Sequence, residues 1–236
     1  ALANGEIIAI LNADGYYYPE TIELVVSQFE RGNADLVYGD LTKLRVLNHQ
    51  EYFKEVKQRG EKREELFLQA ATEVIKDQIE CGIDIVTDGE VRRENYIHYH
   101  CRHIAGVDFE TLTEKVARTG NYKCWLPTII AKVEAQDSFL VHDWKVSQKL
   151  SSKPVKITIP GPMTIADTIA NTYYKSDDKM GFDLAEVINV EIKRLQKAGC
   201  KYIQVDEPLF ARKPQQAIDF GINNLAKCFD GLENTN

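Results

Sequence analysis

Short apolar runs alternate with amphipathic stretches along this chain, and glycine or proline stands at most of the boundaries. Such an alternation predicts buried strands separated by helices, which is the arrangement of parallel α/β proteins. The predicted strands are 7–11, 34–38, 83–87, 155–159 and 202–205. The predicted helices are one that Pro19 opens and others over about 51–81, 92–104, 182–198 (capped by Gly199) and 214–228. Two weaker strands, 125–133 and 138–142, predict a hairpin.

The pattern divides the chain into two unequal parts near residue 46. Residues 1–46 have the order strand–helix–strand, the building block of parallel sheets, and they carry three basic and seven acidic residues. Residues 47–236 carry 26 basic and 29 acidic residues, so the acidic excess is concentrated in the smaller part. We therefore predict a βαβ fragment over 1–46 and a second α/β part over 47–236.

Composition and charge exclude several classes of protein. The chain has 236 residues, 29 of them Lys or Arg and 36 Asp or Glu, and the net charge of −7 disfavours a nucleic-acid module. No apolar run approaches the roughly 18–20 residues that span a bilayer, and no signal peptide is visible. The five cysteines lack any C-x-x-C spacing, which argues against a disulfide framework. We therefore expect a cytoplasmic protein that binds neither nucleic acid nor membrane. The first residue is Ala1 rather than Met, which indicates a fragment or a processed chain.

Three predicted strands end in unusual triplets: Asp-Gly-Glu at 88–90, Pro-Gly-Pro at 160–162 and Asp-Glu-Pro at 206–208. In parallel α/β proteins active sites assemble at the carboxyl ends of the strands, because the strand–helix loops converge there. Two acidic clusters at one such edge suit an ammonium group, a metal ion or general acid–base chemistry. The alternative, equally open from the sequence, is that these acids merely cap the helices that follow.

The run 98–103 contains three histidines and Cys101, which suggests a zinc site. On a helix, however, His98 and His100 point about 200° apart, and only a pair such as His100 and His103 shares a face. Polar helix residues beside a site are therefore the favoured interpretation.

Cysteine and aspartate residues elsewhere are weaker candidates. Cys200 precedes a predicted strand and Cys228 lies on an apolar helix face, so both are predicted to be core residues. Cys124 could touch a ligand but has no paired base nearby in the sequence. Asp14 and Asp40 could hold a divalent ion, although turn capping explains Asp14 at least equally well.

Three motifs stand out in the larger part: QIECGIDIVTDGEVRRENY at 78–96, KITIPGPMT at 156–164 and AGCKYIQVDEPL at 198–209. Together they resemble the C-terminal catalytic barrel of cobalamin-independent methionine synthase, with agreeing order and spacing over about 51–232. The resemblance implies an α/β fold of the TIM-type (β/α)8 barrel kind and methyl transfer to the homocysteine thiol, with zinc holding the sulfur as thiolate. It also implies that Glu90 and Asp206 bind the ammonium group of homocysteine or methionine.

The resemblance has gaps. A full barrel takes about 250 residues, and the family's zinc ligands and proton-donating histidine have no match before Asn236. We therefore expect a truncated barrel with an incomplete site, and we assign no catalytic residue or metal ligand. Thr168 stands where long family members have a folate-stacking tryptophan, so the methyl donor stays open between 5-methyltetrahydrofolate and another donor. The family's opening strand also has no match, and strand 7–11 is a candidate for its place.

The first part carries a different set of motifs, ANGEIIAILNAD at 3–14, PETIE at 19–23 and ADLVYGD at 34–40. These resemble the nucleotide-sugar segment of a GT-A family 2 glycosyltransferase up to about residue 41, with Gly15 where a second metal-binding aspartate is common. The resemblance implies nucleotide-sugar binding as the alternative function. A third possibility is a non-catalytic α/β domain whose motifs are vestigial.

Overall fold

The computed structural model describes residues 60–117 and 122–232. The chain divides into two units, Ala1–Glu64 and Glu65–Asn236, and the second is described below. Several predictions lie outside the described residues: the strands 7–11 and 34–38, the helix opened by Pro19, and the candidate ion site at Asp14 and Asp40.

The charged helix predicted over about 51–81 is present as α3 (Gly60–Glu80) for the part that the structure describes. Ile75 is buried on its inner face. Near the end of the helix, the Gln78 side chain exchanges two hydrogen bonds of 2.8 and 3.0 Å with the backbone of Thr87. These two bonds to the backbone of one residue fix α3 against the strand that follows it.

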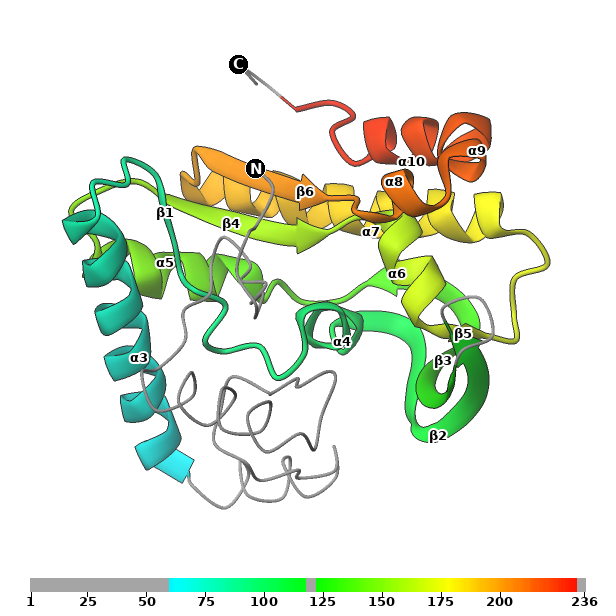
Figure 1. Cartoon of the computed structure of the whole chain (residues 1–236), viewed down its shortest axis with the longest axis horizontal. Coiled ribbons are helices and arrows are strands. Elements are labelled where there is room, and N and C mark those ends of the chain that lie inside the picture. The colour runs from blue at the N-terminus through cyan, green and yellow to red at the C-terminus, as the bar shows by residue number, and fades with distance from the viewer. Residues whose placement is uncertain (1–59, 118–121, 233–236) are drawn as a thin grey trace, which may run out of the picture. The chain divides into compact units, whose positions relative to one another are not determined.

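Three parallel strands form one sheet in the order β1–β4–β6, with β4 in the middle (Figure 1). They are β1 (Val86–Thr87), β4 (Val155–Pro160) and β6 (Tyr202–Asp206). Each lies within or beside a run predicted as a strand, although β1 is shorter than 83–87. The prediction of an α/β fold with a parallel sheet is thus confirmed.

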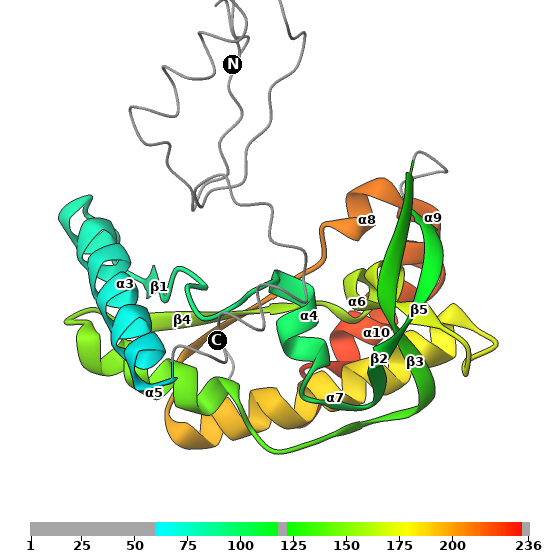
Figure 2. The same cartoon turned by 90° about the horizontal axis from the view of Figure 1, so that it is seen from below.

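Helices α5 (Leu140–Leu150) and α7 (Asp177–Ala198) lie against each other beside this sheet (Figures 1 and 2). Apolar side chains of α7 share one core with the apolar side chains of β4; they are Leu184, Ile188, Ile192 and Leu195 with Ile157 and Ile159. The helix begins at Asp177 rather than at the predicted residue 182, because the Ser176 hydroxyl accepts a hydrogen bond from the Lys179 amide and caps it. It ends as predicted at Gly199, whose φ of 100° suits glycine.

A second sheet has the order β2–β3–β5. A long antiparallel hairpin of β2 (Ile104–Ala117) and β3 (Tyr122–Ala135) makes up most of it, and β5 (Ala170–Asn171) pairs parallel to β3. Figure 2 shows the hairpin running across the direction of β4 rather than along it.

The predicted pairing of 125–133 with 138–142 is wrong, because the partner of β3 is β2. Residues 138–142 instead lead into α5. The Glu191 carboxylate accepts hydrogen bonds from the amides of Phe139 (3.1 Å) and Leu140 (3.0 Å) and thereby caps the first turn of that helix.

The helix predicted over 92–104 is present only as α4 (Tyr96–Cys101), and Ile104 already begins β2. Asn95 starts α4, since its side-chain oxygen accepts hydrogen bonds from two amides of the first turn.

The remaining helical segments are shorter. α6 (Pro162–Thr168) follows β4 directly. The helix predicted over 214–228 is divided into α9 (Pro214–Gln216), the π-helix η2 (Ala217–Gly221) and α10 (Ile222–Lys227), and α8 (Leu209–Arg212) precedes them. Within the described ranges, no helix is both long and apolar enough to cross a membrane.

Candidate functional site

The parallel sheet presents one polar face at the carboxyl ends of β4 and β6. Thr158 pairs in register with Gln204, and Pro160 pairs with Asp206. Side chains two residues apart in a strand point to the same side, so these four residues share one face of the sheet. The residues between them in β4, Ile157 and Ile159, belong to the apolar core. The sheet therefore separates a packed side from a side available for chemistry.

Glu90 is held in an unusual backbone conformation just after β1. It has a φ of 55°, and no other non-glycine residue among those described has a positive φ. Such a conformation costs on the order of 1–3 kcal/mol and persists only where the surroundings enforce it. Here the Asp88 carboxylate accepts a hydrogen bond of 3.0 Å from the Glu90 amide. Gly89 is also left-handed and packs against α3, where a Cβ would lie 2.4 Å from Cγ1 of Val74.

The Glu90 carboxylate is held by two side chains. Thr158 Oγ1 donates to Glu90 Oε1 at 2.5 Å, and Arg93 Nη1 donates to the same oxygen at 2.9 Å. Arg93 also donates to the carbonyl of Thr158 at 3.0 Å, and its side chain is only 1% exposed. A buried guanidinium that grips both β4 and Glu90 ties the strained turn to the centre of the sheet.

Asp206, at the end of β6, is held between two donors. Tyr96 Oη donates to Asp206 Oδ2 at 2.8 Å, and Gln204 Nε2 donates to Oδ1 at 2.5 Å. Burial, and then the hydrogen bond to Asp206, raise the pKa of Tyr96, so its phenol stays a donor. The charge of Glu90 also raises the pKa of Tyr96. The surroundings of the two acids adjoin at Tyr96, which bonds to Asp206 and whose ring centroid lies 5.9 Å from the guanidinium carbon of Arg93, the residue that bonds to Glu90.

Glu207, the neighbour of Asp206, has a different task. Its carboxylate accepts hydrogen bonds from the amides of Met163 (2.7 Å) and Thr164 (3.1 Å) and from the Thr164 hydroxyl (2.8 Å). It therefore caps the N-terminus of α6, and burial raises its pKa. The helix-capping alternative is correct for Glu207, although the capped helix follows β4 rather than β6.

The histidine run lies apart from these carboxylates. His98 packs edge-on against Phe109, while His103 stacks on Phe139 with ring centroids 4.1 Å apart. His100 Nδ1 lies 2.9 Å from the Tyr96 carbonyl, and burial lowers the pKa of His100 well below its usual value. A neutral ring that donates through Nδ1 is the arrangement these facts support.

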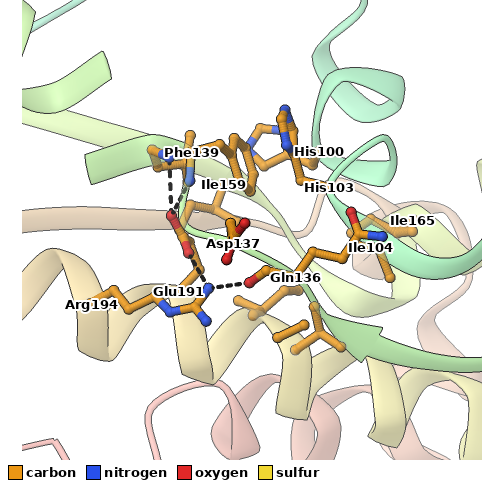
Figure 3. A pocket seen from close by; sticks show the side chains of 14 residues that line it. His100, His103, Ile104, Gln136, Asp137, Phe139, Ile159, Ile165, Glu191 and Arg194 are labelled. Carbon is orange, nitrogen blue, oxygen red and sulfur yellow. Dashed lines mark hydrogen bonds and ion pairs between the residues drawn. The ribbon is translucent and has the colours of Figure 1, made fainter. Parts of the chain in front are cut away.

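A small cavity of about 30 Å³ lies beside this run, between α4, α7 and the segment that joins β3 to α5 (Figure 3). His100, Phe139 and Ile159 are among its lining residues. On the α7 side, Arg194 Nη1 bridges Glu191 (3.2 Å) and the Gln136 carbonyl (2.6 Å). These contacts hold the capping carboxylate of α5 in place, which is a structural role.

None of the described residues forms a group of three or more His, Cys, Asp or Glu side chains that could hold a metal ion. The residues described therefore do not fit the zinc site that the resemblance implies. All five cysteines are free thiols. Cys200 and Cys228 are buried as predicted, with pKa values that burial raises to about 11 and about 12. Cys124 Sγ contacts the Lys115 carbonyl at 3.5 Å.

The reasoning from the sequence did not single out Arg93, Tyr96, Thr158 and Gln204 as parts of the site. The sequence pattern could have pointed to two of these residues, because Thr158 and Gln204 are polar residues within mostly apolar strand runs. Arg93 and Tyr96 carried no comparable signal outside the family motif. Their partners lie 65 and 110 positions away in the chain.

Comparison with known proteins identifies the family to which this chain is similar. The sequence model described as "Cobalamin-independent synthase, Catalytic domain" matches residues 42–217, and the model for glycosyl transferase family 2 matches residues 1–82. The chain is 35% identical over 178 residues to a methionine synthase of Saccharolobus solfataricus, which covers 75% of this chain and 52% of the relative. It is 40% identical over 146 residues to a methionine synthase of Sulfurisphaera tokodaii, covering 61% of this chain and 42% of the relative.

Solved structures agree with these matches. A B12-independent methionine synthase from Shewanella sp. W3-18-1, 36% identical, superposes with a TM-score of 0.68 over 74% of this chain and 51% of that chain. A putative vitamin-B12-independent methionine synthase from Listeria monocytogenes, 16% identical, shares the fold with a TM-score of 0.60 over 80% of this chain and 59% of that chain. The chain thus spans about half the length of the curated relatives above.

The predicted α/β fold of the methionine synthase kind is confirmed by these likenesses. Because the synthase model matches most of the chain and includes β1, β4 and β6, the chain belongs to the family of cobalamin-independent methionine synthase catalytic domains.

Proposed function

We propose that this domain binds homocysteine and methionine through their ammonium group, held between Glu90 and Asp206, as part of methyl transfer to the homocysteine thiol. The observation that carries this proposal is the pair of fixed carboxylates after β1 and β6, one bonded to Arg93 and the other to Tyr96, whose ring centroid lies 5.9 Å from the Arg93 guanidinium carbon. The Shewanella relative was solved in complex with selenomethionine, an amino acid of the same class, which supports the choice of ligand.

The charges of the cluster favour a cation. Glu90 and Asp206 bring two negative charges, and the buried Arg93 guanidinium supplies one positive charge, through its ion pair with Glu90. An ammonium group has three donors and one positive charge, so it can bond to both carboxylates at once. Its binding balances the charge of the cluster.

Methyl transfer also needs an activated thiol and a methyl donor. Zinc in this family would bind the thiol as thiolate and so raise its nucleophilicity. The described residues form no group that fits a zinc ion, so we assign them only binding and orientation of the amino acid. The methyl donor, 5-methyltetrahydrofolate or another, is a small-molecule partner that we infer from the family.

Titration calorimetry with L-methionine and L-homocysteine tests the binding step. Glu90→Gln and Asp206→Asn should each weaken binding about 10- to 100-fold, since a hydrogen bond to a charged group contributes about 1.5–3 kcal/mol. Glu110→Gln, an exposed acid of β2, should leave the affinity unchanged. N-acetyl-L-methionine, which lacks the ammonium group, should bind poorly to the wild type. Equal methionine affinity in all four proteins would refute the proposal.

We further propose that residues 1–46 form a separate part and that the protein acts in the cytoplasm. The glycosyl transferase match to 1–82 supports a distinct origin for the first part, and the free thiols suit a reducing compartment. Binding of UDP that is lost in Asp14→Asn would support nucleotide-sugar recognition by that part. Absence of UDP binding in the wild type would rule it out.

A further inference from the structure

We infer that Tyr96 is a positioning residue of the amino-acid site, which orients Asp206 toward the ammonium group without touching it; this inference rests on the proposed function. Its phenol donates to Asp206 Oδ2 at 2.8 Å from α4, an element 110 positions earlier in the chain. Because burial raises the pKa of Tyr96, the phenol keeps its proton at neutral pH. The Tyr96 hydroxyl is therefore available to donate a hydrogen bond to Asp206.

The second oxygen of the same carboxylate is fixed by Gln204 of the same strand, which is itself held by Lys156 of the neighbouring strand β4. Lys156 Nζ donates to Gln204 Oε1 at 2.6 Å, which turns the amide nitrogen of Gln204 toward Asp206 Oδ1 at 2.5 Å. One donor on each oxygen defines the plane of the Asp206 carboxylate. Each oxygen keeps a further lone pair with which to accept from a ligand.

Tyr96 also connects the two carboxylates. Asn95 caps α4 at the residue before Tyr96, and Arg93 lies two residues earlier again with its guanidinium on Glu90. The segment 93–96 thus carries the donor for each carboxylate. Because both donors lie on one short segment, the orientation of Asp206 is set relative to Glu90 rather than independently of it.

Substitution of two tyrosines on the same helix separates positioning from stability. Tyr96→Phe removes the bond to Asp206, whereas Tyr99→Phe removes a matching bond of 2.7 Å to Asp143, which bonds to neither Glu90 nor Asp206. Calorimetry should show methionine affinity falling about 5- to 20-fold in Tyr96→Phe and unchanged in Tyr99→Phe. In the Asp206→Asn background, Tyr96→Phe should cause no further loss, because it acts only through that carboxylate.

The outcomes are distinct. Weakened binding in Asp206→Asn with wild-type affinity in Tyr96→Phe would overturn this inference and leave the proposed function standing. Unchanged binding in Asp206→Asn would overturn both. If Tyr96→Phe fails to fold, judged by circular dichroism against Tyr99→Phe, then Gln204→Leu replaces it; an unchanged affinity in Gln204→Leu would equally refute a carboxylate fixed by two donors.

Discussion

Gly161 is required by the carboxylate that caps α6, and its replacement by alanine tests this directly. A Cβ at position 161 would lie 2.3 Å from Cδ and from Oε1 of Glu207 and 2.4 Å from Cγ. Ordinary contacts begin near 3.4 Å, so the carboxylate must move by about 1 Å. Gly161 has φ −72° and ψ 161°, which alanine adopts freely, so the clash is the only penalty.

The magnitude follows from the bonds that the displaced carboxylate loses. Glu207 accepts from two backbone amides and one hydroxyl at the start of α6. Loss of a helix cap costs about 0.5–2 kcal/mol, and a charged acceptor lies at the upper end of this range. Replacing glycine by alanine also stabilises the protein by about 0.4–1 kcal/mol, because alanine lowers the conformational entropy of the unfolded chain. We expect Gly161→Ala to lower the free energy of unfolding by about 1 kcal/mol.

A double-mutant cycle is the decisive assay. In the Glu207→Ala background there is no carboxylate to displace, so Gly161→Ala should be neutral or stabilising by up to about 1 kcal/mol. Urea unfolding followed by tryptophan fluorescence gives the free energies, and amide hydrogen exchange over 162–168 shows whether the loss is at α6. Gly82→Ala is the control, since no atom lies within 4 Å of its Cβ and its cost comes from a φ of 83° alone. Additive effects of Gly161→Ala and Glu207→Ala would refute the reasoning.

Two further predictions concern pH. Burial raises the pKa of Asp88, so ionisation of this carboxyl opposes folding, and the wild type should lose stability relative to Asp88→Asn as the pH rises above about 4. Urea unfolding from pH 4 to 8 should show a widening difference in the free energy of unfolding between the two proteins. A constant difference would contradict the prediction. Burial lowers the pKa of His100, so its neutral ring stabilises the fold. This stabilisation is fully present above about pH 6.5, the pKa in the unfolded chain, and is lost as the pH falls through the lower pKa of the folded state. His100→Asn, although less stable at pH 7, should therefore show a flatter decline in the free energy of unfolding between pH 6.5 and 5, and parallel curves would exclude this role.

The elements that the sequence predicted correctly are those determined by their own residues. The runs 155–159 and 202–205 are short, mostly apolar and have glycine or proline nearby on each side, so they could be recognised as β4 and β6 without knowledge of their partners. The predictions were wrong where a residue distant in the sequence determines the local secondary structure. Residues 138–142 begin a helix because Glu191, some fifty positions later, caps it. No local pattern carries that information.

The site shows the same division. The acids at 88–90 and 206–208 stood out because strand ends meet at one edge of a parallel sheet, and the family resemblance then pointed to Glu90 and Asp206 among them. Each is fixed by one donor that is near in the sequence, Arg93 or Gln204, and by one that is distant, Thr158 or Tyr96. Tyr96 reaches Asp206 only because α4 lies over the ends of β4 and β6, which is a property of the packing and not of the run in which Tyr96 stands.

Each of the two acidic pairs at the strand ends contains one carboxylate with a structural role and one that we propose for ligand binding. After β6, Asp206 turns to the polar face while its neighbour Glu207 caps α6. After β1, Asp88 is buried and holds the backbone turn, and this turn carries Glu90 to Thr158 and Arg93. Asp206 and Glu207 are neighbours and point to opposite sides, whereas Asp88 and Glu90 are separated by Gly89 in a turn where residues 89 and 90 both have a positive φ. The sequence left open, for each pair, whether its acids cap the structure or bind a ligand. The structure gives Glu207 and Asp88 the structural roles, and Asp206 and Glu90 are the acids that we propose for the ammonium group.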